Sequence, residues 1–244
     1  MVKAGSLFKD RNEAGVKLAA NLLDEPLIKA AAREDLLVLS IPRGGVIVGA
    51  VVAQALGCSH DIIAVNKIGF PGQKETIIGA MAEDGLMVLN RQILNWSNSY
   101  IKQAIKLAKT RLEISLRKFR PGRELDLRPK TVIVVDDGIV TGETMKAALM
   151  WLALKEKPKR PTQVLAAVPV CAAQAARDFE KLADKFICLN TLDQLPAVGQ
   201  VYQNFNPIGD REVRDYLSPS LTVLPLWQFK PNVPVNDLAY AGCN

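Results

Sequence analysis

The chain has 244 residues, of which 49% are hydrophobic, enough for one large domain with a substantial core. Its net charge of +6 comes from Lys and Arg spread along the chain, so we expect no nucleic-acid binding, and a small polyanionic substrate explains the balance equally well. A signal peptide, an apolar run of membrane-spanning length and a CxxC pair are all absent from the sequence, which predicts a cytoplasmic protein with reduced thiols and no zinc site.

The spacing of apolar residues predicts strands that alternate with helices. In chain order we expect a helix over residues 8–23, a strand over 35–41, a helix over 46–56, strands over 61–66, 77–82 and 86–89, a helix over 97–119, a strand over 132–135, a helix from 145 to 149, a strand over 163–170, a helix over 172–182 and a strand over 185–189. Gly57 is the expected C-cap of the second helix, and residues 67–74, rich in Gly, Pro and Lys, are predicted to form a mobile loop. This alternation favours an α/β fold with a doubly wound, mostly parallel sheet and helices on both faces, with ligands at the carboxyl ends of the strands.

The two ends of the chain are expected to cover this core. Six prolines punctuate the tail beyond Asn190, and the tail has too few periodic segments for a core of its own. We therefore predict a single domain over residues 1–244, with a core at about 30–190 and a small cap from residues 1–25 and 190–244.

The stretch VIVVDDGIVTGETMKAAL, residues 132–149, combines a buried strand, two acids, a small-residue loop and the start of a helix. Backbone amides of the loop and the dipole of the following helix suit a phosphate, and the threonines add hydroxyl donors. Asp136 and Asp137 would repel a phosphate, but they suit neutral hydroxyls or a metal ion. A ribose 5-phosphate has both parts. The candidate phosphate-binding residues are Gly138, Ile139, Val140, Thr141, Gly142, Glu143 and Thr144.

A second candidate anion site, Arg43-Gly44-Gly45, lies between a predicted strand and a predicted helix. The guanidinium group of Arg43 would supply charge, and Gly44 and Gly45 would expose their amides. A tight connection with a surface arginine is the alternative.

The stretch VIVVDDGIVTGET resembles the phosphoribosyl-pyrophosphate-binding signature of type I phosphoribosyltransferases, with an apolar strand, two acids, a small loop and Thr-Gly-x-Thr. Val140 stands where that family usually has alanine. The stretches SIPRGGVIVG, NKIGFPGQKETIIGAMAEDG, AAVPV and YQNFNPIGDREV are similar to a bacterial branch of the family with a poorly defined substrate, so the resemblance covers most of the chain.

The resemblance implies transfer of ribose 5-phosphate from phosphoribosyl pyrophosphate to a nitrogen acceptor such as a nucleobase, with Mg²⁺ as the cofactor and pyrophosphate as the leaving group. It implies that Asp136 and Asp137 bind the ribose hydroxyls, directly or through Mg²⁺. The Arg43–Gly45 loop would bind the pyrophosphate, Lys67 could reach it, and a peptide bond beside Arg43 would be strained. A homodimer and no membrane partner are also expected.

Two other functions stay open: a non-catalytic regulator that binds phosphoribosyl pyrophosphate or a nucleotide, and a general sugar-phosphate-binding module. The presence of Arg43 and Lys67 argues against the regulator. Tyr202 and Phe205 could stack on a flat acceptor ring, although buried packing is the commoner fate of such aromatic residues. His60, the single histidine, is expected to be structural or exposed rather than a general base.

Overall fold

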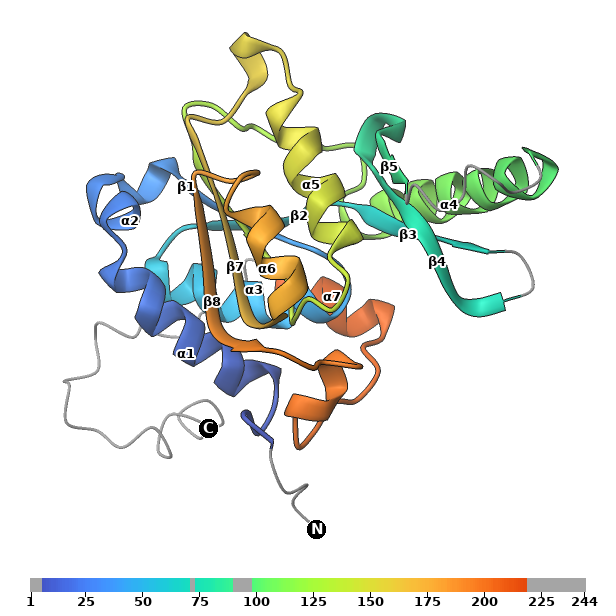
Figure 1. The fold of residues 1–244 in the computed structure, drawn as a ribbon. Helices are drawn as coiled ribbons and strands as arrows, with labels where there is room; N and C mark the ends of the chain where they lie inside the picture. The colour runs from blue at the N-terminus through green and yellow to red at the C-terminus, as the bar shows by residue number, and fades with distance from the viewer. Residues whose placement is uncertain (1–5, 71–72, 90–97, 219–244) are drawn as a thin grey trace.

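The computed structural model describes residues 6–70, 73–89 and 98–218, which form two sheets packed against helices (Figure 1). The strands are β1 (Leu36–Ser40), β2 (Ser59–Ile62), β3 (Val65–Phe70), β4 (Gln73–Ala82), β5 (Met87–Leu89), β6 (Thr131–Val135), β7 (Gln163–Ala172) and β8 (Lys185–Leu192). The α-helices are α1 (Arg11–Asp24), α2 (Pro26–Ala30), α3 (Gly44–Leu56), α4 (Asn98–Phe119), α5 (Glu143–Ala153), α6 (Ala173–Phe179) and α7 (Asp210–Leu217).

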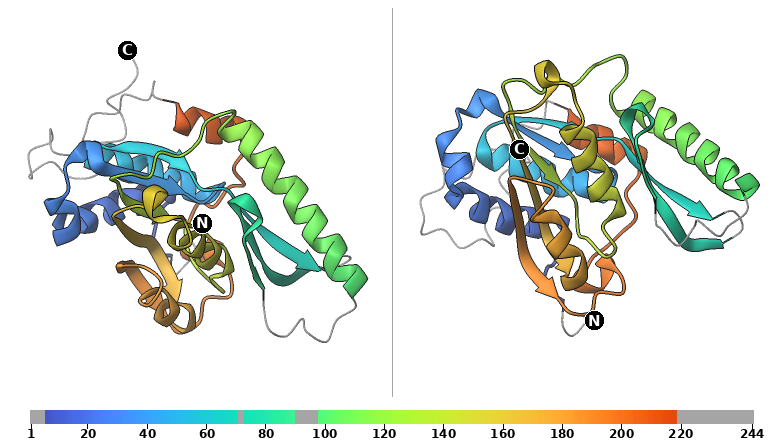
Figure 2. Two further views of the ribbon diagram at one scale, coloured as in Figure 1. Left: turned by 90° about the horizontal axis from the view of Figure 1, so that it is seen from above. Right: turned by 45° about the horizontal axis from the view of Figure 1, so that its top comes forward.

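The main sheet has five parallel strands in the order β2-β1-β6-β7-β8, which confirms the predicted doubly wound α/β fold. Every residue of β1 and β6 is buried, as expected for strands covered on both faces. Helices α1 and α3 cover one face, and α5 and α6 cover the other (Figures 1 and 2). The carboxyl ends of β1 and β6 therefore lie side by side in the middle of the sheet.

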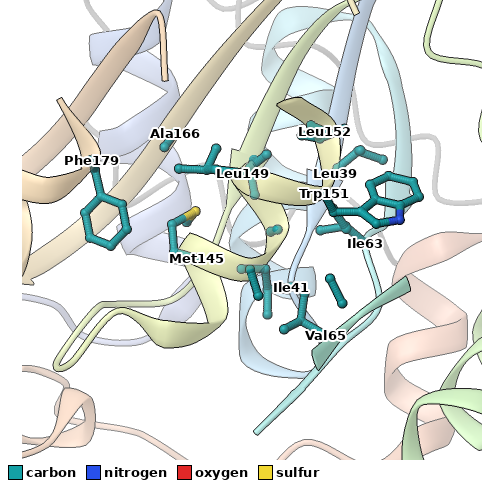
Figure 3. Close-up of a cluster of buried hydrophobic side chains, with 14 of the residues drawn as sticks. Leu39, Ile41, Ile63, Val65, Met145, Leu149, Trp151, Leu152, Ala166 and Phe179 are labelled. Atoms are coloured by element: carbon teal, nitrogen blue, oxygen red, sulfur yellow. The ribbon is translucent and has the colours of Figure 1, made fainter. Parts of the chain in front are cut away.

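Packing of α5 on the sheet forms the largest buried cluster (Figure 3). Met145 and Leu149 of α5 lie against Leu39 of β1 and Ala166 of β7, and each of these side chains is at most 1% exposed. Full burial of a side chain of this size contributes about 1.5–3 kcal/mol, so the cluster anchors the N-terminal end of α5 at the sheet edge.

A second, antiparallel sheet corrects two predictions. The strand expected over residues 61–66 divides into β2, which joins the main sheet, and β3, which begins a three-stranded sheet in the order β3-β4-β5. The predicted loop over residues 67–74 is wrong, because most of these residues belong to β3 and β4; residues 71 and 72 lie outside the described residues. Ile68 and Ile78 pack against α4, so the apolar contacts favour strand pairing despite the Gly and Pro content.

The region after β8 contains more regular structure than its prolines predict. A short 3₁₀ turn covers Val198–Val201, and α7 follows at Asp210–Leu217. This helix buries only Val213 fully, and its low content of apolar residues gives the sequence little sign of it. The N-terminal segment meets this region through a parallel bridge between Phe8 and Tyr202.

The described cysteines are free thiols, with Cys171 buried and Cys58 and Cys188 partly buried, while Cys243 lies outside the described residues. Among the helices of the described chain, none combines the length and the apolar character needed to cross a membrane.

Candidate functional site

Two carboxylates emerge where β6 ends at the centre of the main sheet. The Asp136 carboxylate accepts a hydrogen bond of 2.8 Å from the backbone amide of Asp137. Burial, and then the neighbouring charge of Asp137, raise the pKa of Asp136 well above its usual range, while the charge of Lys67 acts in the opposite direction. A cation or a hydroxyl donor placed here would therefore relieve an unfavourable arrangement.

Arg11 at the start of α1 belongs to the N-terminal segment expected to form the cap, but the sequence did not place it beside the two acids. Its Nε donates to Asp137 Oδ2 over 2.8 Å, and the two side chains are only 9% and 13% exposed. Its guanidinium also lies 3.8 Å from the ring centroid of Phe205 and donates to the carbonyl of Asn206 at 3.0 Å. The pair is 126 residues apart in the chain, so no local pattern could reveal it.

Tyr202 adopts the buried packing that the sequence left open as the alternative to ring stacking on a ligand. Its side chain is fully buried, its ring packs between those of Phe8 and Phe205, and its hydroxyl donates to the Asp137 carbonyl at 2.7 Å. Burial is the main cause that raises the pKa of the Tyr202 hydroxyl. Tyr202 therefore fixes the backbone of the acidic pair.

The candidate phosphate loop is attached to the end of β7. Ile139 donates its amide to the Val170 carbonyl at 2.9 Å, and Ala172 donates its own amide to the Ile139 carbonyl at 2.8 Å. Because the Ile139 amide is used in this way, it cannot also donate to an anion, contrary to the expectation that every amide from 138 to 144 faces the phosphate. The continuous stretch of amides after Ile139 begins at Val140, and Gly138 is separated from it by Ile139.

Gly142 allows the loop to enter α5. Its φ angle of 88° lies in the left-handed region, and an added Cβ would lie 2.7 Å from Cζ of Phe179. As the N-cap of α5, Gly142 offers no side-chain hydrogen bond to the first-turn amides. The Thr141 hydroxyl donates to the Glu143 carboxylate beside it. An uncapped helix N-terminus with a glycine at its entry suits an anion.

The Arg43–Gly45 loop lies directly against the two acids. An ideal Cβ on Gly44 would lie 1.8 Å from Asp137 Oδ2, and one on Gly45 would lie 2.9 Å from the Asp136 Cα. The peptide bond between Pro42 and Arg43 is cis. The close approach explains why this loop has two glycines.

The side chain of Arg43 extends toward α7. It donates to the Ile208 carbonyl at 3.0 Å and pairs with Asp210 at 2.9 Å, with 53% of the arginine side chain exposed. The backbone of the predicted anion loop therefore reaches the acids, whereas the guanidinium does not.

Lys67 lies within β3, not after a strand as the sequence suggested, and its side chain is exposed. Its charge still acts on Asp136, as the pKa of that acid shows.

His60 lies inside β2 and hydrogen-bonds through Nε2 to the Ser40 hydroxyl at 2.8 Å. Burial lowers its pKa to about 4, so it is neutral at physiological pH. This agrees with the structural role expected for it.

Three comparisons place this chain in a known family. Residues 9–202 match the family model of the phosphoribosyl transferase domain. The chain belongs to the phosphoribosyl transferase family. Two relatives from Mycobacterium tuberculosis, "Putative phosphoribosyl transferase Rv0571c" and "Putative phosphoribosyl transferase MT0597", are each 36% identical over 216 residues.

Those matches cover 86% of this chain and 46% of each relative, so the chain spans about half the length of the curated relatives. The crystal structure of TT1426 from Thermus thermophilus is 33% identical, with a TM-score of 0.65. The alignment covers 86% of this chain and 97% of TT1426, so the two proteins share their fold over nearly all of TT1426.

Proposed function

We propose that this protein transfers ribose 5-phosphate from phosphoribosyl pyrophosphate to a nitrogen acceptor, such as a nucleobase, and releases pyrophosphate. One observation carries the proposal: Gly44 and Gly45 pack against Asp136 and Asp137 where the uncapped N-terminus of α5 begins. Candidate sites for a diphosphate, two sugar hydroxyls and a monophosphate therefore lie along one sheet edge.

Each part of the substrate has a proposed partner. The 5-phosphate binds the amides from Val140 to Thr144, with Ile139 excluded because its amide is bonded to β7. The ribose hydroxyls donate to Asp136 and Asp137. The backbone of the Arg43–Gly45 loop faces the diphosphate, and Lys67 adds positive charge from β3. The supports for these roles are the close packing at the glycines and the effect of Lys67 on Asp136.

The reaction then follows from positioning and charge. The lone pair of the acceptor nitrogen attacks C1 of the ribose, the C1–oxygen bond breaks with its electrons leaving on pyrophosphate, and the nucleobase acceptor releases a proton to solvent. Positive charge grows on the sugar ring beside the two carboxylates, and negative charge grows beside the amides of the glycine loop. Fixed groups of this kind stabilise the charges without having to reorganise during the reaction.

Mg²⁺ fits this site as a cofactor shared with the substrate. Among the described residues no group of three or more His, Cys, Asp or Glu could hold a metal ion, so Asp136 and Asp137 would act with substrate oxygens. Mg²⁺ is commonly held by one or two carboxylates together with phosphates and water. The raised pKa of Asp136 supports a cation nearby. When bound, Mg²⁺ would neutralise charge on the leaving pyrophosphate.

Release of pyrophosphate tests the proposal. The protein is incubated with phosphoribosyl pyrophosphate, Mg²⁺ and a panel of nucleobases, and the matched control is the Asp136→Asn/Asp137→Asn variant. We expect release above the control with at least one acceptor. Tight binding of phosphoribosyl pyrophosphate without release by any acceptor would instead support a non-catalytic regulator.

A further inference from the structure

A separate cavity of about 390 Å³ lies between α4, the start of β3 and the Pro42–Arg43 peptide. Its volume is within the range of small-molecule sites. Its polar lining residues come from four different parts of the fold and supply the charges and hydrogen-bonding groups of the cavity. They are Arg43, Asn66, Arg111, Ser115, Lys118 and Asp210.

The charges on this cavity are unbalanced. Arg43 pairs with Asp210 at 2.9 Å, and Lys118 pairs with the other oxygen of the same carboxylate. Arg111 has no carboxylate within ion-pair distance among the described residues. Three cations therefore share one acid, which leaves a net positive charge for an anionic ligand. A single carboxylate already bridges two of the cations, as a bound anion would.

The side-chain amide of Asn66 is a second, independent sign that this cavity binds a ligand. Asn66 Nδ2 is buried and has no hydrogen-bond partner among the residues that the structure describes. Buried polar groups in folded proteins nearly always have a partner, because an unsatisfied donor costs about 1–3 kcal/mol. Asn66 and Ser115 both line the cavity, so an oxyanion bound there lies beside the residue with the unsatisfied donor.

This cavity is distinct from the acidic loop. Asn66 and Lys67 are neighbours on β3 and point to opposite faces of the strand, with Asn66 at the cavity and the charge of Lys67 acting on Asp136. Likewise, Gly44 contacts Asp137 while the Arg43 side chain lines the cavity. The cavity and the sugar-phosphate site therefore lie on two sides of one loop.

We propose that the cavity binds a condensed phosphate group, either inorganic diphosphate or the diphosphate of a nucleotide. Arg43, Arg111 and Lys118 supply the charge, and Asn66 donates a neutral hydrogen bond. Asp210 holds Arg43 and Lys118 until the anion displaces it. Because Arg43 precedes the glycine that contacts Asp137, occupancy of the cavity bears directly on the loop of the proposed catalytic site.

Calorimetric titration of inorganic diphosphate into the full chain tests this proposal and requires no turnover, so its result stands whether or not phosphoribosyl transfer is found. We expect saturable binding that weakens at least about tenfold in Arg111→Ala/Lys118→Ala, since each lost charge-assisted bond corresponds to tenfold or more. The matched control is Arg117→Ala on the same helix, whose exposed arginine pairs with Glu113 and does not line the cavity. Equal affinity in the double variant and the wild type would overturn the proposal.

Two further variants separate the roles. Asp210→Asn removes the competing carboxylate, so diphosphate should bind more tightly, a gain that a merely structural role would not produce; weaker binding would contradict it. Asp136→Asn/Asp137→Asn should retain diphosphate binding at the cavity, and its complete loss would show that the cavity is not a separate site. With ADP as the probe, weaker binding in Arg111→Ala/Lys118→Ala identifies a nucleotide ligand, whereas unchanged ADP binding limits the site to free diphosphate.

Discussion

Replacing Arg11 should destabilise the free protein strongly, although Arg11 lies far from Asp137 in the sequence. Arg11→Met keeps an unbranched side chain beside Phe205 but removes the ion pair with Asp137 and the bond to the Asn206 carbonyl. Loss of one partner of a buried ion pair costs about 3–5 kcal/mol, because the other charge remains buried and unpaired. Both side chains keep about a tenth of their exposure, so water still reaches the remaining charge. We therefore expect the free energy of unfolding to fall by about 3 kcal/mol, the lower end of this range.

Urea denaturation followed by circular dichroism measures this change in the free energy of unfolding. The double variant Arg11→Met/Asp137→Asn should recover at least about 2 kcal/mol of the loss, because it no longer buries an unpaired charge. The control is Lys17→Met on the same helix, whose exposed pair with Glu13 should contribute less than about 1 kcal/mol. A loss below about 1 kcal/mol in Arg11→Met, or additive effects in the double variant, would refute a stabilising role of the Arg11–Asp137 ion pair.

Three other substitutions test separate parts of the structure. The pKa of Asp136 is raised in the folded chain, so the folded state holds a proton that the unfolded state loses, and stability falls as the pH rises from about 3.8. Asp136→Asn should therefore raise the melting temperature at pH 7, with a gain that shrinks toward pH 4, while pyrophosphate release falls at least about tenfold. Gly142→Val forces a β-branched residue to a φ of 88° and toward Phe179, so calorimetry should show ribose 5-phosphate binding at least about tenfold weaker. Arg120→Met leaves Glu83 buried without its partner and should reduce the free energy of unfolding by about 3–5 kcal/mol in urea.

Each of these expectations has a contradicting result. An unchanged or lower melting temperature in Asp136→Asn at pH 7 would show that the carboxylate is not strained in the free protein. Normal ribose 5-phosphate affinity in Gly142→Val would remove the loop from phosphate binding; Gly209→Ala, with open space around its Cβ, is the matched control. A change in Arg120→Met no larger than in the exposed control Arg117→Met would mean that the buried pair contributes little.

The sequence predicts the central strands and helices well because each is marked by residues that are close together in the chain. The apolar run of β6 and the helix α3 with its C-cap at Gly57 are where the sequence placed them. The two acids and the loop before α5 also follow their strand as expected. A strand buried on both faces shows as a short run of apolar residues, and a helix end in the left-handed conformation shows as a glycine, so a few neighbouring residues are enough to predict either feature.

Features that depend on distant contacts were not predictable in this way. Residues 67–74, where β3 ends and β4 begins, were mistaken for a loop because their Gly, Pro and Lys content hides the strand pattern that buries Ile68 on α4. Helix α7 was missed because only a narrow apolar stripe around Val213 is buried. The partners of Arg11 and Arg43 lie more than a hundred residues away, so only the folded chain identifies them.

The central claim is that the start of α5 and the two acids after β6 together bind a ribose 5-phosphate. A crystal structure of the chain with ribose 5-phosphate tests it most directly. We expect the phosphate to accept hydrogen bonds from backbone amides between Val140 and Thr144, with the sugar hydroxyls on Asp136 and Asp137. A phosphate bound elsewhere, or backbone carbonyls that face it from this loop, would show that this loop is not the phosphate site.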